Sequence, residues 1–110
     1  MKSIQSLVEE CHNIALQKDW WAGEERNFGE LLCLIHAEIS ETLEEYRNHK
    51  GFDEIYFNGE KPEGIPIELA DVLIRIFDLC GKYDIPLEKA IDMKIEYNKT
   101  RPSRHGGKRA

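Results

Sequence analysis

Two pairs of carboxylates have the spacing that places side chains on one face of a helix. Glu38 and Glu41 are three residues apart in LIHAEISETLEEYR, where Glu45 continues their stripe, and Glu68 and Asp71 are three apart in IPIELADVLIRIFDLC. Residues i and i+3 lie one above the other on a helix. The second pair stands in a strongly apolar segment, where uncompensated charges are costly. If the two helices pack side by side, four carboxylates gather and require a cation.

The ligand type predicts which cation this would be. A cluster made only of oxygen ligands suits a hard ion, Mg²⁺ or alternatively Mn²⁺. Helical di-iron sites use Glu-x-x-His, and no histidine stands three residues after Glu38, Glu41 or Glu68. His36 precedes Glu38 by two residues and so faces elsewhere, and we interpret it as a partly buried structural histidine. The alternative for the acids is a solvated helix face, which the repeated spacing on a second helix disfavours.

The pattern of apolar residues predicts four helices, over about 3–18, 27–48, 66–82 and 86–100, and no convincing strand. Asn27, followed by Glu30, is a predicted N-cap. Residues 48–66 form a long connection rich in Gly, Pro, Asn and Asp, in which YFNGEK gives a weak signal for a hairpin turn. We therefore expect an all-α, four-helix bundle-like domain with two long antiparallel central helices and a long loop between the second and third.

Length and composition fit one globular domain, residues 1–100, followed by a flexible basic tail, residues 101–110. The chain has 110 residues, of which 41% are hydrophobic and 33% charged. No apolar run is long enough to span a membrane, and the first residues lack the apolar centre of a signal peptide, so we expect a cytoplasmic protein. The three separated cysteines predict buried or half-buried free thiols and no disulfide framework or zinc site: Cys11, Cys33 and Cys80.

The charge of the chain is unevenly distributed. Residues 94–110 contain six basic residues and one acid, a net charge of +5. Because the whole chain has a net charge of −6, residues 1–93 have a net charge of −11. An acidic body does not resemble the broad basic face of a duplex nucleic-acid binder. It suits a phosphate ligand joined to the acidic part by metal ions.

Several stretches of the chain resemble a known family. The ordered set Glu38-x-x-Glu41, 26 intervening residues and Glu68-x-x-Asp71 is similar to the signature of the MazG-like, all-α nucleoside triphosphate pyrophosphohydrolases. The similarity extends over nearly the whole chain, through NFGELLCLIHAEISETLEEYR, KPEGIPIELADVLIRIFDL and KIEYNKTRPSRHGGKRA. It implies a magnesium-dependent enzyme that hydrolyses a nucleoside triphosphate to the monophosphate and pyrophosphate. It also implies a homodimer or homotetramer.

The resemblance also implies residue roles. The metal ligands would be Glu38, Glu41, Glu68 and Asp71. The triphosphate would be bound by Lys94, Asn98 and Arg101, with Arg104 and Lys108 as additions. Positions 94, 98 and 101 share one helix face, in agreement with this role. Water would attack the α phosphorus while Lys94 and Arg101 stabilise the leaving pyrophosphate.

One position departs from the family pattern, because Ala37 stands where some relatives have an extra glutamate that assists the attacking water. Either Glu41 or a water activated by the ions would replace it. Trp20 and Trp21 could stack on a base, or at least one of them could simply fill the core. Lys18 is a further candidate phosphate contact. Arg75 and Asp78 are interpreted as an ion pair or surface charges.

Three hypotheses remain open from the sequence. The first is the metal-dependent pyrophosphohydrolase. The second is a non-catalytic helical module that senses nucleotides or binds a protein partner, which the alanine at position 37 favours. The third, a purely structural bundle, leaves the paired carboxylates unexplained.

Overall fold

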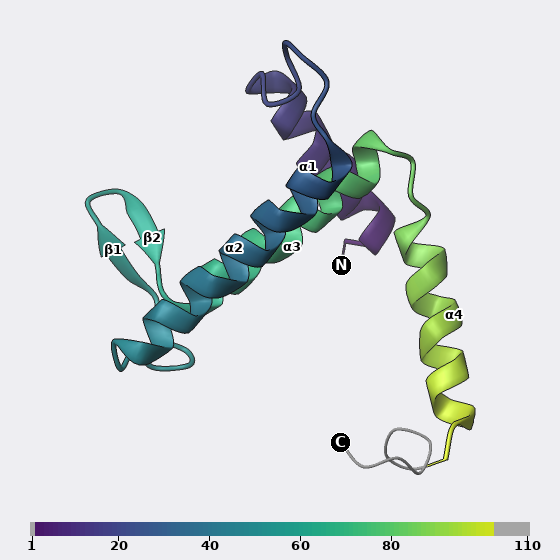
Figure 1. Cartoon of the computed structure of the whole chain (residues 1–110). Coiled ribbons are helices and arrows are strands. Elements are labelled where there is room, and N and C mark those ends of the chain that lie inside the picture. Colours follow the sequence, from purple (N-terminus) through teal and green to yellow (C-terminus); the bar gives the residue numbers. More distant parts are fainter. Residues whose placement is uncertain (1, 103–110) are drawn as a thin grey trace.

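The fold consists of four helices and one short hairpin (Figure 1). The computed structural model describes residues 2–102. In chain order the elements are α1 (Ile4–Gln17), α2 (Phe28–Arg47), β1 (Tyr56–Asn58), β2 (Lys61–Glu63), α3 (Ile65–Lys82) and α4 (Leu87–Thr100). The four predicted helices are confirmed, each end within one residue of its expected position. The domain is therefore mostly helical, as the sequence predicts.

The prediction that the chain contains no strand is wrong. β1 pairs antiparallel with β2, with Asn58 opposite Lys61, and the hairpin turn suspected at YFNGEK is confirmed. Gly59 adopts a positive φ of 66° in this turn, a conformation that costs glycine little. Each strand has only three residues, too few for a readable alternation of apolar and polar side chains.

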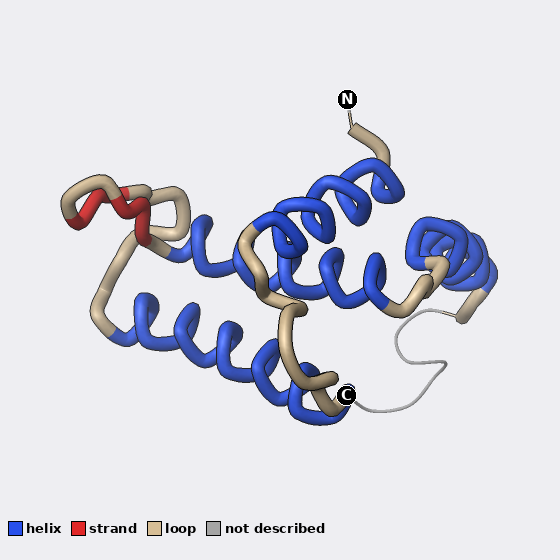
Figure 2. Tube along the Cα trace, turned by 90° about the horizontal axis from the view of Figure 1, so that it is seen from above, coloured by secondary structure: helices blue, strands red, loops and turns tan. Residues whose placement is uncertain are grey.

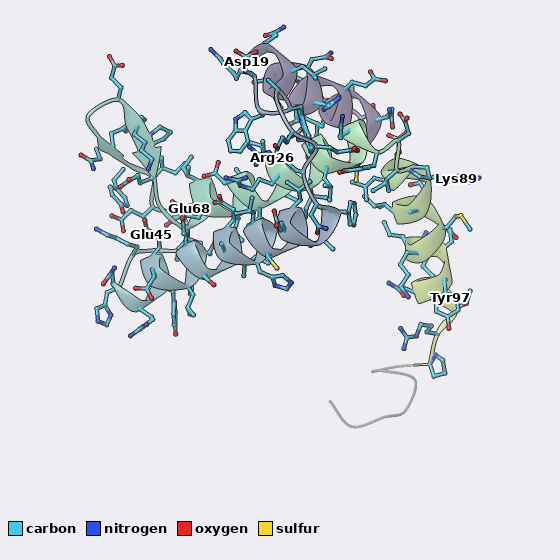
Figure 3. The ribbon with its side chains drawn as sticks, turned by 45° about the horizontal axis from the view of Figure 1, so that its top comes forward. Asp19, Arg26, Glu45, Glu68, Lys89 and Tyr97 are labelled. Atoms are coloured by element: carbon cyan, nitrogen blue, oxygen red, sulfur yellow. The ribbon has the colours of Figure 1, made fainter. Side chains whose placement is uncertain are left out.

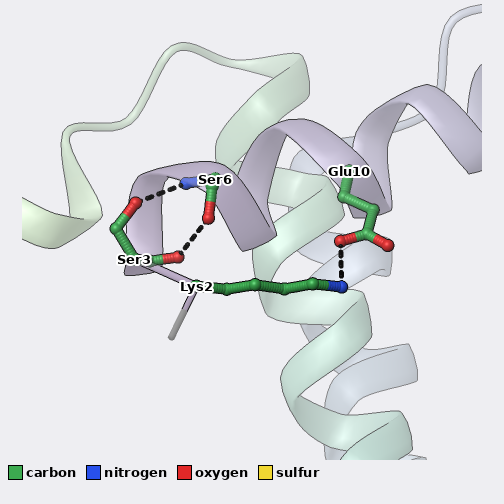
Figure 4. Close-up of polar contacts among 4 residues, drawn as sticks. All are labelled: Lys2, Ser3, Ser6 and Glu10. Atoms are coloured by element: carbon green, nitrogen blue, oxygen red, sulfur yellow. Dashed lines mark hydrogen bonds and ion pairs between the residues drawn. The ribbon is translucent and has the colours of Figure 1, made fainter.

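Side-chain caps fix the starts of α1 and α2. The hydroxyl oxygen of Ser3 accepts a hydrogen bond from the backbone N–H of Ser6, and the Ser6 hydroxyl donates to the Ser3 carbonyl (Figure 4). Figure 4 also shows the Lys2–Glu10 ion pair, 2.7 Å, along the first turns of α1. Asn27 accepts from the N–H of Glu30 at 3.2 Å, which confirms the predicted cap of α2.

Helix α3 lies between α1 and α2 and contacts both (Figure 2). It runs antiparallel to α2, as predicted, so that the end of α2 lies beside the start of α3 (Figure 1). This central place follows from its sequence, which is apolar on more than one face and supplies most of the buried side chains. Val8 of α1 packs on Phe77 and Cys80 of α3 to form the main core cluster.

Helix α4 extends away from the other three, so the single chain does not close into the expected four-helix bundle (Figure 1). No residue of α4 is buried, and its main contacts are with α1, where Glu88 accepts a hydrogen bond from the backbone N–H of Gln5. The radius of gyration is 16.7 Å, compared with about 13 Å for a compact chain of this length. None of the helices within residues 2–102 is long and apolar enough to cross a membrane.

The three thiols are free, as expected, but they differ in exposure. Cys80 is buried and Cys11 is half-buried, whereas Cys33 is exposed. The expectation of a sheltered thiol is therefore wrong for Cys33, because none of the described helices covers the outer face of α2.

Candidate metal and nucleotide site

The antiparallel pairing of α2 and α3 brings three of the four predicted metal ligands together. Glu38, Glu41 and Glu68 each offer a carboxylate oxygen, and these oxygens lie within 4.8 Å of one another. Glu41 is exposed, Glu38 half-buried and Glu68 buried. Figure 3 shows Glu68 between the two helices. Asp71 lies one turn further along α3 and outside this tight group, but the charges of Glu38 and Glu41 act on it.

Glu68 is the one buried charged residue among those described, with 8% of its surface exposed. Its Oε2 atom is buried and has no hydrogen-bond partner among the described residues. Burial raises the pKa of Glu68 to about 7, helped by the adjacent carboxyl group of Glu41 and by the charges of Asp71 and Glu38. Burial and the charge of Glu38 also raise the pKa of Asp71, against the opposing effect of Arg75. The cluster therefore gathers more negative charge than the neighbouring cations offset.

Arg75 offsets part of this negative charge. Its Nε donates to Oε1 of Glu38 at 2.7 Å, and both side chains are partly buried. The same guanidinium lies over the ring of Trp20, 5.1 Å from the centroid. Arg75 therefore connects a predicted metal ligand to a predicted base-stacking residue, a role that the sequence interpretation missed.

Asp78 pairs with α1 rather than with Arg75. Its Oδ1 atom lies 2.9 Å from Nδ1 of His12 and accepts a second hydrogen bond from Nε1 of Trp21, also at 2.9 Å. The spacing of Arg75 and Asp78 is the sequence signal for their place at the site. They follow Asp71 by four and seven residues, and these three positions share one face of α3. Their partners could not be read from the sequence.

A cavity of about 260 Å³ adjoins the acidic cluster. Glu38, Asp71, Arg75 and Asp78 line its polar side. Its other walls come from α1 and the segment that follows, and they include Ile14, Ala15, Lys18 and Trp20. This places the predicted phosphate contact Lys18 and the indole of Trp20 at the same cavity as two predicted metal ligands.

The two tryptophans have different surroundings. Trp20 is 44% exposed, with the guanidinium of Arg26 5.4 Å from its ring centroid in addition to that of Arg75. Trp21 is half-buried and contacts His12 and Tyr83 edge to face, with centroid distances of 6.1 and 6.2 Å. The indole of Trp20 is thus the more accessible of the two, and Trp21 contributes to packing between α1 and α3.

The predicted triphosphate-binding residues of α4 do not meet the acidic cluster within this chain. Lys94, Asn98 and Arg101 are exposed, and Lys94 and Arg101 lie over the ring of Tyr97. Figure 3 shows Tyr97 at the opposite side of the molecule from Glu68. Arg104 and Lys108 lie outside the described residues.

Three further positions of α2 lie outside the carboxylate group: His36, Ala37 and Glu45. His36 is exposed, so its interpretation as a partly buried histidine is wrong. Ala37 is also exposed and supplies no carboxylate. Glu45 accepts from the hydroxyl of Tyr56 at 2.8 Å, a bond that raises the pKa of Tyr56 to about 12. Glu45 thus connects α2 to the hairpin instead of extending the acidic cluster.

No family model, no curated protein and no solved structure matches this chain.

Proposed function

We propose that the protein is a magnesium-dependent nucleoside triphosphate pyrophosphohydrolase, with Mn²⁺ as an alternative ion. It would convert a ribo- or deoxynucleoside triphosphate to the monophosphate and pyrophosphate. The observation that carries this proposal is the buried, unpartnered oxygen of Glu68 within a group of three carboxylates. A buried acceptor of this kind is costly unless a donor or a cation meets it.

The donor set fits a hard divalent ion. Glu38, Glu41 and Glu68 supply only carboxylate oxygens, and Asp71 stands beside them. A bound ion would offset the charge of the phosphates and make a water molecule more acidic. Burial and the neighbouring carboxylates raise the pKa values of Glu68 and Asp71, and a bound cation would act in the opposite direction.

The chain's own residues would carry the remaining chemistry. The attacking water forms a bond to the α phosphorus, and the bond from that phosphorus to the bridging oxygen breaks, releasing pyrophosphate. Glu41 is the exposed carboxylate of the group and would accept the proton of the water, since Ala37 offers none. Trp20 would stack on the base in the adjoining cavity.

The cations of α4 would act from a second copy of the chain. Lys94 and Arg101 are exposed on a helix that extends away from its own acidic cluster. In a homodimer or homotetramer, α4 of one copy could lie over the cluster of another and stabilise the leaving pyrophosphate. Asn98 shares the face of Lys94 and Arg101 and would join them.

A direct assay tests the proposed reaction. The purified protein is incubated with a panel of ribo- and deoxynucleoside triphosphates and Mg²⁺ or Mn²⁺, and monophosphate and pyrophosphate are quantified. We expect equimolar products, lost in the Glu38→Gln, Glu68→Gln double variant. Glu44→Gln, on the same helix as Glu38 but exposed and paired with Arg47, is the matched control and should retain activity. No turnover of any nucleotide with either ion contradicts the proposal.

A second candidate function is a nucleotide-sensing module without turnover. The distance between the α4 cations and the acidic cluster within one chain favours it, as does Ala37. Nucleotide-dependent thermal stabilisation without pyrophosphate release would select this alternative.

A further inference from the structure

One oxygen of the Asp78 carboxylate is hydrogen-bonded to two side chains, and the other has no partner within residues 2–102. His12 and Trp21 both approach Oδ1, each at 2.9 Å. The indole N–H can only donate, and the imidazole nitrogen facing an ionised carboxylate also donates. Within residues 2–102, no hydrogen bond reaches Oδ2, although the side chain is only 18% exposed. Two donors from different segments therefore fix the carboxylate and leave one oxygen available.

This carboxylate lines the cavity beside the acidic cluster, together with the guanidinium of Arg75. Arg75 uses its Nε atom for Glu38, and its two terminal nitrogens make no hydrogen bond to the described residues. The cavity thus offers one acceptor from Asp78 and free donors from Arg75, between apolar walls from Ile14 and Ile74. This is the pattern of a planar heterocycle site with a polar edge.

The charge on Asp78 discriminates between nucleobase edges. A carboxylate oxygen accepts an N–H and repels a carbonyl, and the N–H of uracil or thymine is flanked by two carbonyls. On its Watson–Crick edge, guanine places its amino group beside a ring N–H, where Arg75 requires an acceptor, and its accepting N3 lies next to the sugar. Cytosine and adenine each present one amino group beside a ring nitrogen that accepts, which matches Asp78 next to Arg75.

We propose that Asp78 is a specificity-determining residue that accepts a hydrogen bond from the amino group of cytosine or adenine, while Arg75 donates to the neighbouring ring acceptor. This inference rests on the proposed function, because it places a nucleotide at the cavity. His12 and Trp21 are positioning residues that hold Asp78.

The test measures binding separately from turnover. Dissociation constants of the non-hydrolysable α,β-methylene analogues of CTP, ATP, UTP and GTP are measured by calorimetry with Mg²⁺. We expect the cytosine and adenine analogues to bind about tenfold tighter or more than the uracil and guanine analogues, the effect of one discriminating hydrogen bond. Asp78→Asn, whose amide can also donate to a carbonyl, should reduce that ratio about tenfold. Asp92→Asn, the same change on exposed α4, should leave the ratio unchanged.

A second measurement uses the unaltered protein and remains decisive if Asp78→Asn does not fold. The α,β-methylene analogue of purine riboside triphosphate, which lacks the amino group of adenine, should bind about tenfold more weakly than the α,β-methylene analogue of ATP. Equal affinity for all bases, equal affinity for the purine riboside and ATP analogues, or no nucleotide binding overturns the inference. Selective binding without pyrophosphate release would contradict the proposed reaction but support the role of Asp78.

Discussion

At the scale of single residues, Glu68 is the group on which the proposed site depends most. Its buried Oε2 has no hydrogen-bond partner in the part of the chain that the structure describes, and its carboxylate lies among other acids. A functional site often retains such a locally unfavourable group because a ligand compensates for it. Two predictions follow from this one side chain, one on metal binding and one on pH.

We expect Glu68→Gln to have opposite effects without and with Mg²⁺. At pH 8 without metal, removal of a buried, poorly paired charge should stabilise the protein by about 1 kcal/mol, or on the order of 4–8 °C in Tm. The Mg²⁺-induced rise in Tm seen with the wild type should disappear in the variant. Thermal unfolding of both proteins, with Glu44→Gln as control, checks this. A variant that still responds to Mg²⁺ as the wild type does would exclude Glu68 as a ligand.

The pH dependence of the metal-free protein should report the same residue. Burial raises the pKa of Glu68 from 4.5 to about 7, so the folded state holds a proton that the unfolded state has released. The free energy of unfolding should therefore fall as pH rises between about 4.5 and 7. Chemical denaturation across this range should show less of this decline in Glu68→Gln. Identical pH profiles for the two proteins would contradict the raised pKa.

The four carboxylates could be identified from the sequence because their i, i+3 spacing within apolar helices is local information. The partners of Arg75 and Asp78 could not, since Glu38 and His12 come from other helices and depend on how α1 and α2 cross α3. Likewise, the interpretation of His36 failed because the spacing around it does not reveal that no other described helix covers the outer face of α2.

At the scale of elements, the crossing of α1 over α3 positions the cavity. Gly81 allows this close approach, since a Cβ at that position would lie 2.5 Å from Cβ of His12. His12 in turn contacts Asp78. The helix spans were predictable from caps and apolar periodicity. The close contact of Gly81 with His12 was not, because the sequence shows only that this glycine lies near a helix end.

We expect Gly81→Ala to destabilise the protein although alanine favours helix formation by about 1 kcal/mol. Forcing α1 away from α3 should cost about 1–3 kcal/mol, and it should also disturb the contact between His12 and Asp78. Chemical denaturation gives the change in stability. If the alanine variant is more stable than the wild type, the two helices are not in close contact at this point.

At the scale of the whole molecule, many large apolar side chains are exposed and are not covered by any of residues 2–102. The outer face of α2 exposes large side chains at heptad-like spacing, between 42% and 59% exposed: Leu32, Ile39, Leu43 and Tyr46. Patches of this kind mark interaction surfaces. The sequence shows that these positions are apolar. It does not show whether a neighbouring helix of the same chain or a second copy of the chain covers them.

We expect the protein to self-associate through this face of α2. Leu43→Glu, which introduces a charge at its centre, should shift the protein toward the monomer, whereas Gln17→Glu on the exposed end of α1 should not. Light scattering after size-exclusion chromatography measures the mass of each protein. A wild-type monomer at all concentrations would contradict this expectation.

The proposal that α4 of one copy completes the acidic site of another can be tested by complementation between two inactive variants. Glu41→Gln and Lys94→Gln should each be inactive alone, but after mixing and subunit exchange some sites combine an intact acidic cluster with an intact α4. Random exchange in a dimer restores about a quarter of the sites. No recovery, despite exchange verified by native mass spectrometry, would show that each site uses residues of one chain only.

Attack by water on the α phosphorus is tested most directly by hydrolysis in ¹⁸O-labelled water followed by mass spectrometry. With Mg²⁺ and a nucleoside triphosphate that is turned over, we expect one ¹⁸O atom in the monophosphate and none in the pyrophosphate. Label in pyrophosphate, release of inorganic phosphate in its place, or no product from any nucleotide would contradict the proposed function.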